Sequence, residues 1–374
     1  MSSINIDSID KSDLELVPYR EKIEDVAFKT ESISYIRDVW KRFKRDRVTQ
    51  VAGSAILVIL IMAIIGPFLN DHDPLHQIPH WQFLPPRIPG IENIGIFNGT
   101  RVMNIQESSL ADFGDSIIAI VSEFEIAVRG GNVRMLEVRV NMYNHIGAND
   151  TYFWFGSDAL GRDVFTRLWN GARISLLMAF SVSMITLSIG FVVGSICGYY
   201  GGWVDMIIQR CMEIIGYIPQ IPLFILLILR FGASIQTMIM VFVLTGWLGI
   251  ANGVRIQFYR FKNREYVLAS RTMGASDPRL MFKHIAPNAI GTIITQVILV
   301  IPFVVFAEAG LSYLGLGVQP PATSIGLLLV DGQNNLRDNA FLIGPPSVVI
   351  ITLMLAFNLF GNGLRDAFNP SLRQ

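Results

Sequence analysis

Residues 174–200 read ISLLMAFSVSMITLSIGFVVGSICGYY and contain no charged side chain. A helix crosses the hydrocarbon core of a bilayer with roughly 20 mostly apolar residues, so this stretch is long enough to span it. Backbone polar groups inside lipid must be paired within the segment, and a single segment can do that only as a helix. The stretch therefore predicts a membrane-spanning helix.

Further uncharged runs lie on both sides of this stretch. Hydrophobic residues make up 51% of the 374-residue chain and charged residues 16%, against about 25% charged in soluble domains. Pro219 and Pro222 interrupt one run, which is expected to be kinked or broken near its middle. We predict an all-α polytopic membrane protein with six transmembrane helices. The other five runs are 51–69, 214–229, 231–254, 285–307 and 339–364.

The distribution of basic residues predicts the orientation. Cytoplasmic flanks of membrane spans carry an excess of Lys and Arg, and a basic cluster directly precedes the first run. This places both termini in the cytoplasm, the segment 70–172 outside and the loop 255–288 inside. The expected location is the cell membrane, plasma or inner. The cluster consists of Arg37, Lys41, Arg42, Lys44, Arg45 and Arg47.

The segment 1–50 is expected to be cytoplasmic and to contain a helix lying on the membrane surface. Within 33–47, apolar residues recur at helical spacing and basic residues occupy the other face, as in interfacial helices. An ordinary basic stretch beside the membrane obeys the same charge rule and remains an alternative. The apolar set is Ile33, Ile36, Trp40 and Phe43.

The external insert 70–172 is long enough for a small domain, and its patterns favour β-structure. Asn98-Gly99 lies between 94–97 and 101–105, which is a hairpin signature. Gly130-Gly131 lies between 117–128 and 133–140, and the second of these segments alternates apolar and polar residues. We predict a small β-rich domain with two hairpins.

Three histidines in the insert, His72, His76 and His80, have a spacing that could place metal ligands on one helical face. Pro74 and Pro79 interrupt any such helix. We therefore expect a solvated loop and no metal site. Cys197 and Cys211 lie in or beside apolar runs and form neither a disulfide framework nor a metal pattern.

The sequence contains no motif for nucleotide hydrolysis or for ion coupling. A phosphate-binding loop requires a Gly-Lys pair, and the chain has none. Paired charges within the spans, which would mark an ion relay, are nearly absent. No catalytic residues and no cofactor are expected in this chain, and its zero net charge points to no nucleic acid partner. If the chain transports, a partner must supply the energy at a cytoplasmic surface.

Residues 265–288 read EYVLASRTMGASDPRLMFKHIAPN and provide such a surface. Residues 265–273 are expected to be helical, Gly274 to end that helix, and Ser276-Asp277-Pro278 to begin a second short helix. The stretch resembles the signature of the membrane subunits of bacterial ABC importers. Leu268 stands where the general pattern has its glutamate, and the preceding Glu-Tyr-Val resembles the dipeptide, oligopeptide and nickel branch. The matching positions are Ala269, Ser270, Gly274 and Pro287.

The resemblance implies that this knob is a coupling helix, which docks in a cleft of an ATPase subunit. The alternative is a basic loop lying on the membrane surface. The residues expected to couple to the ATPase are Glu265, Tyr266, Ala269, Ser270, Arg271, Gly274, Ala275, Ser276, Asp277 and Arg279.

Residues 155–176 contain the stretch GSDALGRDVF and are similar to the entry of the second span in that branch. The charges here can pair locally beside the external interface. We favour a structural brace for the insert over a contact for a substrate-binding protein. The brace residues are Asp158, Arg162, Asp163, Arg167 and Arg173.

A third similar stretch, AEAGLSYLGLG at 307–317, carries Glu308 near the end of a span. An ionisable group at membrane depth is a functional hypothesis: Glu308 could face a translocation path or brace helix ends, and we favour the brace slightly. Other positions that could line a path are Gln220, Gln236, Thr245, Asn252 and Asn358.

The resemblance implies a type I ABC importer core with alternating access. Its partners would be a second homologous permease subunit, two ATPase subunits that hold ATP and Mg, an external peptide-binding protein and the lipid bilayer. The expected division is 1–50, the first span 51–69, the insert 70–172, and a permease core 173–374. Oligopeptides are the expected cargo; dipeptides, nickel and glutathione are alternatives. A self-sufficient ion-coupled carrier and an intramembrane enzyme are alternatives from other classes.

Overall fold

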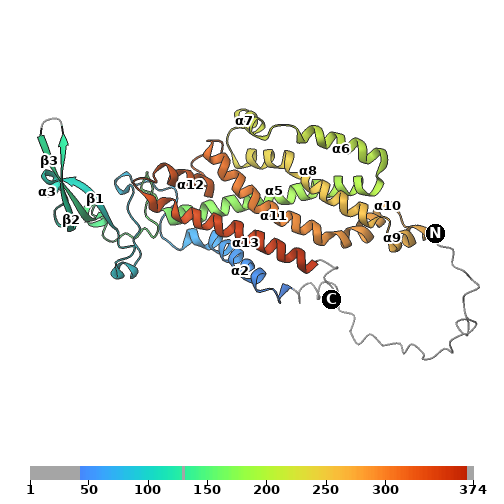
Figure 1. Ribbon diagram of the computed structural model, residues 1–374, viewed down its shortest axis with the longest axis horizontal. Helices are drawn as coiled ribbons and strands as arrows, with labels where there is room; N and C mark the ends of the chain where they lie inside the picture. The colour runs from blue at the N-terminus through green and yellow to red at the C-terminus, as the bar shows by residue number, and fades with distance from the viewer. Residues whose placement is uncertain (1–42, 129–130, 369–374) are drawn as a thin grey trace, which may run out of the picture.

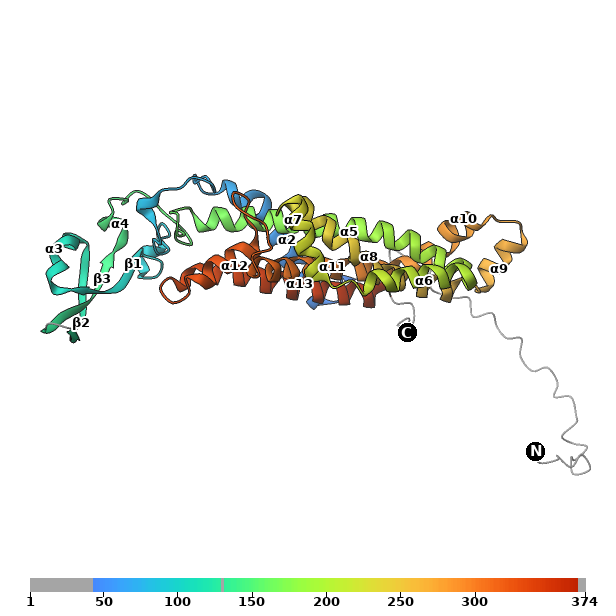
Figure 2. The same cartoon turned by 90° about the horizontal axis from the view of Figure 1, so that it is seen from above.

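The computed structural model describes residues 43–128 and 131–368. A bundle of long helices carries a β-sheet at one end, called here the sheet end. At the other end, the loop end, lie α9 (Glu265–Thr272) and α10 (Asp277–Arg279) (Figures 1 and 2). Arg37, Lys41 and Arg42, with most of the surface helix expected over 33–47, lie outside the described residues.

The long helices confirm the predicted fold class. Within the described ranges, five helices are long and apolar enough to cross a membrane, and a bent pair makes up to six. The pair is α6 (Gly202–Gly216) and α7 (Gln220–Phe231), which are bent by 74°. The break contains Pro219, so the expected interruption of the third span is confirmed. The five single helices are α2 (Arg47–Ile65), α5 (Val164–Tyr200), α8 (Ile235–Phe261), α11 (Ala286–Tyr313) and α13 (Gly344–Phe368).

Two span boundaries differ from the prediction. The third crossing begins at Gly202 rather than at 214, because the helix continues through Glu213, which bounds the uncharged run and pairs with Arg210 at 2.6 Å. The fifth runs on to Tyr313, so Glu308 lies inside a helix rather than after it. Charged residues with internal partners are tolerated inside these helices, which a scan for uncharged runs cannot detect.

Small residues allow α5 and α8 to lie in close contact. A Cβ at Gly194 would lie 2.3 Å from the carbonyl oxygen of Ala251, and one at Gly198 would lie 2.5 Å from that of Arg255. Both glycines are on one face of α5, at the i, i+4 spacing that brings helix backbones together in membranes. The two helices therefore behave as a closely packed pair.

Two apolar cores stabilise the bundle. The larger one includes Leu168, Met178 and Leu353 and joins α5 with α11, α13 and their neighbours. The second, at the loop end, includes Phe258 and Leu280 and joins the end of α5, α8, α9 and the start of α11. The loop end is thus packed onto the spans and is not an isolated appendage.

The sheet end contains three antiparallel strands in the order β1-β3-β2. These are β1 (Thr100–Gln106), β2 (Ile117–Val128) and β3 (Gly131–Asn141). The hairpin expected at Gly130-Gly131 is confirmed, because Val128 pairs with Gly131 and the register continues along both strands. Val138 and Val140 of the central strand are fully buried.

The hairpin expected at Asn98-Gly99 is wrong. Residues before it form a 3₁₀ helix (Ile91–Ile94), and β1 pairs with β3 instead. Asn98 and Gly99 do make a turn, with Gly99 at φ +72° and the Asn98 side chain accepting the N–H of Thr100 at 3.2 Å. The turn leads into a strand whose partner, β3, lies farther along the chain.

Short elements complete the fold. His72 stacks on Phe153 with ring centroids 4.6 Å apart, and His80 lies in a separate 3₁₀ turn, so no single helix carries the three histidines. Among the described residues, no group of three or more His, Cys, Asp or Glu side chains could hold a metal ion. The remaining helices are α3 (Leu110–Phe113), α4 (Met142–His145), α12 (Ile325–Asn334) and 3₁₀ turns at Gly66–Phe68, Pro79–Trp81, Glu107–Ser109, Gly114–Ser116 and Ala340–Leu342.

Candidate functional site

The loop between α8 and α11 forms a helical knob at the loop end (Figure 2). The first helix, α9, ends two residues before Gly274, which has φ +86° as expected for a glycine that terminates a helix. The second helix is not separate: α10 continues through a π-helical turn (Leu280–Ile285) into α11. Ser276 stands at the cap position, but its side chain makes no capping hydrogen bond. The expectation of two short helices is corrected to one short helix and the extended start of a span.

The knob has a buried face and an exposed face. Val267 and Leu280 are fully buried in the core of the loop end, and Ser270 is buried beside them. On the other face Met273 is 81% exposed, and a Cβ at Gly274 would meet nothing within 4 Å. An exposed apolar side chain beside an open turn is a surface that a protein partner can cover. The other exposed residues of the expected coupling set are Glu265, Tyr266, Ala269, Arg271, Ser276, Asp277 and Arg279, and Ala275 is half-buried.

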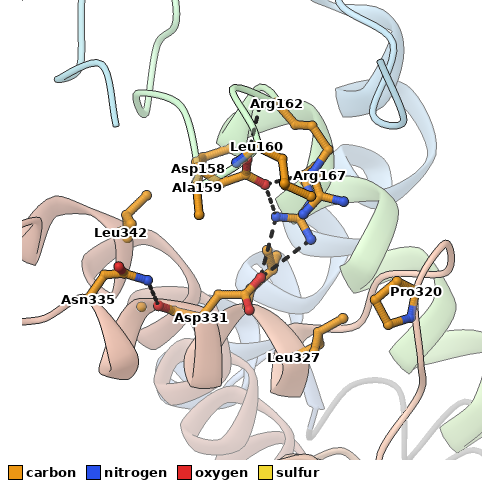
Figure 3. Close-up of a pocket in the computed structure, with 13 residues that line it drawn as sticks. Asp158, Ala159, Leu160, Arg162, Arg167, Pro320, Leu327, Asp331, Asn335 and Leu342 are labelled. Atoms are coloured by element: carbon orange, nitrogen blue, oxygen red, sulfur yellow. Dashed lines mark hydrogen bonds and ion pairs between the residues drawn. The ribbon is translucent and has the colours of Figure 1, made fainter. Parts of the chain in front are cut away.

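At the sheet end, three of the five expected brace residues, Asp158, Arg162 and Arg167, lie together (Figure 3). Asp158 accepts a hydrogen bond from Arg162 Nε at 2.8 Å and a second one from Arg167. Arg167 is almost fully buried, and its guanidinium also faces the carboxylate of Asp331 at 3.5 Å. Asp163 caps α5 by accepting the N–H of Thr166 at 2.8 Å. Arg173 is exposed and has no ion-pair partner among the described residues.

These charges border a cavity of about 240 Å³ between the start of α5 and α12. Burial raises the pKa of Asp331 above its ordinary value, and the neighbouring Arg167 partly opposes that rise. Burial likewise raises the pKa of the Asp163 carboxyl, against the lowering effect of its bonds to Thr166. The cluster ties α12 to the start of α5 through charges. Asp331 was not found from the sequence, although it is the one acid in an otherwise uncharged helix.

Glu308 is enclosed on all sides by protein and has no exposed surface. Its Oε1 accepts hydrogen bonds from Ser312 and Ser324, both at 2.7 Å. Ser324 also caps α12 by accepting the N–H of Leu327 at 3.1 Å. A carboxylate at a helix N-terminus is favourably placed with respect to the helix dipole. The geometry thus supports the bracing role for Glu308, with α12 as the element that it holds.

Two of the positions suggested for a path, Gln220 and Thr245, contact each other. Gln220 donates to Thr245 at 2.9 Å and lines a cavity of about 250 Å³ with apolar neighbours. Asn252 accepts from Gln209 at 3.2 Å on another part of the bundle. Gln236 and Asn358 are exposed; Gln236 lies on α8, as Thr245 and Asn252 do, and Asn358 lies on α13. A pathway lined by these residues remains a prediction.

Comparisons with known proteins agree with this arrangement. Residues 190–374 match the family described as binding-protein-dependent transport system inner membrane component, and residues 34–86 match the N-terminal transmembrane domain of oligopeptide transport permease C. The chain is 44% identical to the oligopeptide transport system permease protein of Bacillus subtilis strain 168 over 92% of each chain. Its identity to the dipeptide permease of the same organism is 35%, over 92% of this chain and 89% of that one.

A dipeptide permease of Lactococcus lactis subsp. cremoris strain MG1363 is 33% identical, over 91% of both chains. These matches and the long helices define a multi-pass membrane permease subunit of the ABC transporter class. The chain belongs to the family of inner membrane components of binding-protein-dependent transport systems. This is a family of transport subunits rather than enzymes, and it implies ATPase and binding-protein partners.

Proposed function

We propose that this chain is one of two membrane subunits of an ATP-driven importer of oligopeptides. The observation that carries the proposal is the knob at the loop end, whose Gly274 turn and exposed Met273 face away from a buried apolar anchor. Two ATPase subunits would bind ATP and Mg, and one of them would cover this face. A second homologous permease subunit and an external peptide-binding protein would complete the transporter.

The orientation follows from the charges. Lys44 and Arg45 precede α2, Arg47 is its first residue, and the loop that contains α9 is rich in Lys and Arg. The positive-inside rule then places both termini and the loop end in the cytoplasm and the sheet end outside. In this orientation the knob meets the ATPase, and the charge cluster of Asp158, Arg167 and Asp331 braces the external end.

Peptide cargo is supported by the names of the relatives. The relative at 44% identity is an oligopeptide permease, and those at 35% and 33% are dipeptide permeases. Oligopeptides are therefore the first candidate and dipeptides the second. Transport would proceed by alternating access, because a site that faces one side at a time lets ATP binding drive net import.

The test is retention of the ATPase by the intact complex. Met273→Asp places a charge on the exposed face of the knob without touching its buried anchor. Val102→Asp, at a 45% exposed position of the sheet, is the matched control at the other end. We expect the tagged Met273→Asp complex to keep the second permease and lose the ATPase subunits, and the control to keep both. Retention of the ATPases and of ATP-dependent peptide uptake by Met273→Asp would refute the docking proposal.

A further inference from the structure

A tyrosine at the end of α5 makes contact with both arms of the knob. The hydroxyl of Tyr199 donates to Asp277 Oδ1 at 2.5 Å and accepts from Arg271 Nη2 at 3.3 Å. The guanidinium of Arg271 also lies 5.6 Å from the centre of the Tyr199 ring. Tyr199 is 5% exposed, so the ring is packed in the core of the loop end.

The two partners lie on opposite sides of the Gly274 turn. Arg271 belongs to α9, before the turn, and Asp277 begins α10, after it. The turn itself has open space around Gly274, so it gains no support from packing at that point. One hydroxyl thereby connects the arms whose relative angle sets the shape of the exposed face.

The other side of Tyr199 is attached to the rigid helix pair. Its carbonyl oxygen lies 3.4 Å from Lys262 Nζ at the end of α8. One residue earlier, Gly198 brings the α5 backbone against the carbonyl of Arg255, and Arg255 makes two 2.6 Å hydrogen bonds to Asp205 of α6. A displacement of the knob can therefore pass through Tyr199 to three helices of the bundle.

At the knob, apolar contacts provide attachment to the bundle and hydrogen bonds provide direction. Burial of Val267 and Leu280 attaches the knob to the bundle, but apolar contacts are non-directional. Hydrogen bonds depend strongly on angle and distance, and those to charged partners are the strong ones. The Tyr199 hydroxyl thus adds a directional restraint on the orientation of the knob, beside the continuity of α10 with α11.

We infer that Tyr199 is a positioning residue that couples the knob to α5 through Asp277 and Arg271, so that movement of the docked ATPase is transmitted to the spans. The inference rests on the proposed docking of the ATPase at the knob. It adds a residue outside the loop, whose loss would uncouple hydrolysis from transport while leaving the docking face in place.

The test uses Tyr199→Phe in the complete transporter, reconstituted in vesicles with its binding protein. This variant removes one oxygen atom and keeps the ring in the core. Tyr200→Phe is the matched control, because the neighbouring Tyr200 is 52% exposed and its hydroxyl makes no hydrogen bond within the described part of the chain. ATP hydrolysis and peptide uptake are measured in the same vesicles, and their ratio is the readout.

We expect Tyr199→Phe to assemble with its ATPases in wild-type amount and to hydrolyse ATP, with the peptide transported per ATP reduced about tenfold, as the loss of a charge-assisted hydrogen bond implies. Tyr200→Phe should keep the wild-type ratio. Asp277→Ala should lower the ratio similarly, and the double variant should lower it no further, because both changes remove the same bond.

A wild-type ratio in Tyr199→Phe overturns the inference. Loss of the ATPase subunits from that variant also overturns it, because the hydroxyl would then merely support the docking face. Failure of the proposed function looks different: the wild-type complex itself would lack ATP-dependent uptake, or Met273→Asp would keep its ATPases.

Discussion

Replacing Arg167 with Met should show how much the charge cluster at the sheet end stabilises the fold. Methionine has a similar length and no charge, so the change removes the guanidinium and leaves most of the packing. The side chain of Arg167 is 1% exposed and that of Asp158 is 5% exposed. Breaking a buried ion pair by removing one partner typically costs about 3–5 kcal/mol.

The expected cost lies toward the lower end of that range. Asp158 would keep Arg162 at 2.8 Å and the N–H groups of Leu160 and Arg162 at 2.8 and 3.0 Å, so its charge would not be left alone. Asp331, whose side chain is 39% exposed, could turn toward water. We therefore expect Arg167→Met to lower the free energy of unfolding by about 3 kcal/mol.

The assay is denaturant or thermal unfolding of the purified chain in detergent, followed by intrinsic fluorescence. Asp331→Asn is the control and should change the free energy of unfolding by less than about 1 kcal/mol, as for partly exposed pairs. The double variant Arg167→Met with Asp158→Asn should be less stable than Arg167→Met alone, because the Asp158 carboxylate still pairs with Arg162 and accepts two N–H groups in the single variant. A cost below about 1 kcal/mol for Arg167→Met, or a double variant that is more stable than the single one, would refute the reasoning.

Three further predictions concern close packing and pH. Gly194→Val should lower the free energy of unfolding by about 1–3 kcal/mol, because the added side chain overpacks the contact of α5 with α8. Gly249→Val is the control and should not lower it, because a Cβ there meets nothing within 4 Å. Melting curves of the two variants in detergent provide the comparison. Gly326→Ala should weaken the packing of α12, because the added Cβ would lie 2.6 Å from Ala309 Cα. Limited proteolysis should cut this variant near α12 more readily than the control Gly310→Ala, where a Cβ has open space. Equal resistance of the two variants would contradict the prediction. The folded-state pKa of Asp331 is raised, so the folded chain binds this proton more tightly and its stability should rise as pH falls from the raised pKa toward the ordinary value of 3.8. Asp331→Asn should flatten that part of the stability curve, and an unchanged slope would contradict the assignment.

The coupling loop shows how far local sequence can predict a site. Gly274 was expected to end a helix, and it does so with a positive φ, because that requirement is local. Ser276 was expected to cap a second helix, and its side chain makes no such bond. The continuation of α10 into α11 depends on the packing of Leu280 and Ile285 into the core of the loop end, which no local pattern contains.

The strands at the sheet end were also predictable only where the deciding contacts are local. The turn at Gly130-Gly131 joins two neighbouring strands in the sequence and was found correctly. The turn at Asn98-Gly99 has equally good local chemistry, but its strand pairs with β3 across the sheet. Turn chemistry predicts that the chain reverses, but it does not identify the strand that becomes the partner.

The membrane-spanning class, the broken third span and the glycine turn of the knob were predictable from local patterns, because the length of an apolar run, a proline and a glycine act on the nearest residues. The contact of Arg167 with Asp331, 164 residues away, and that of Tyr199 with Asp277, 78 residues away, arise only in the folded chain. Such partners are brought together by the angles and close approach of packed helices. Those depend on all the side chains at the helix contacts at once.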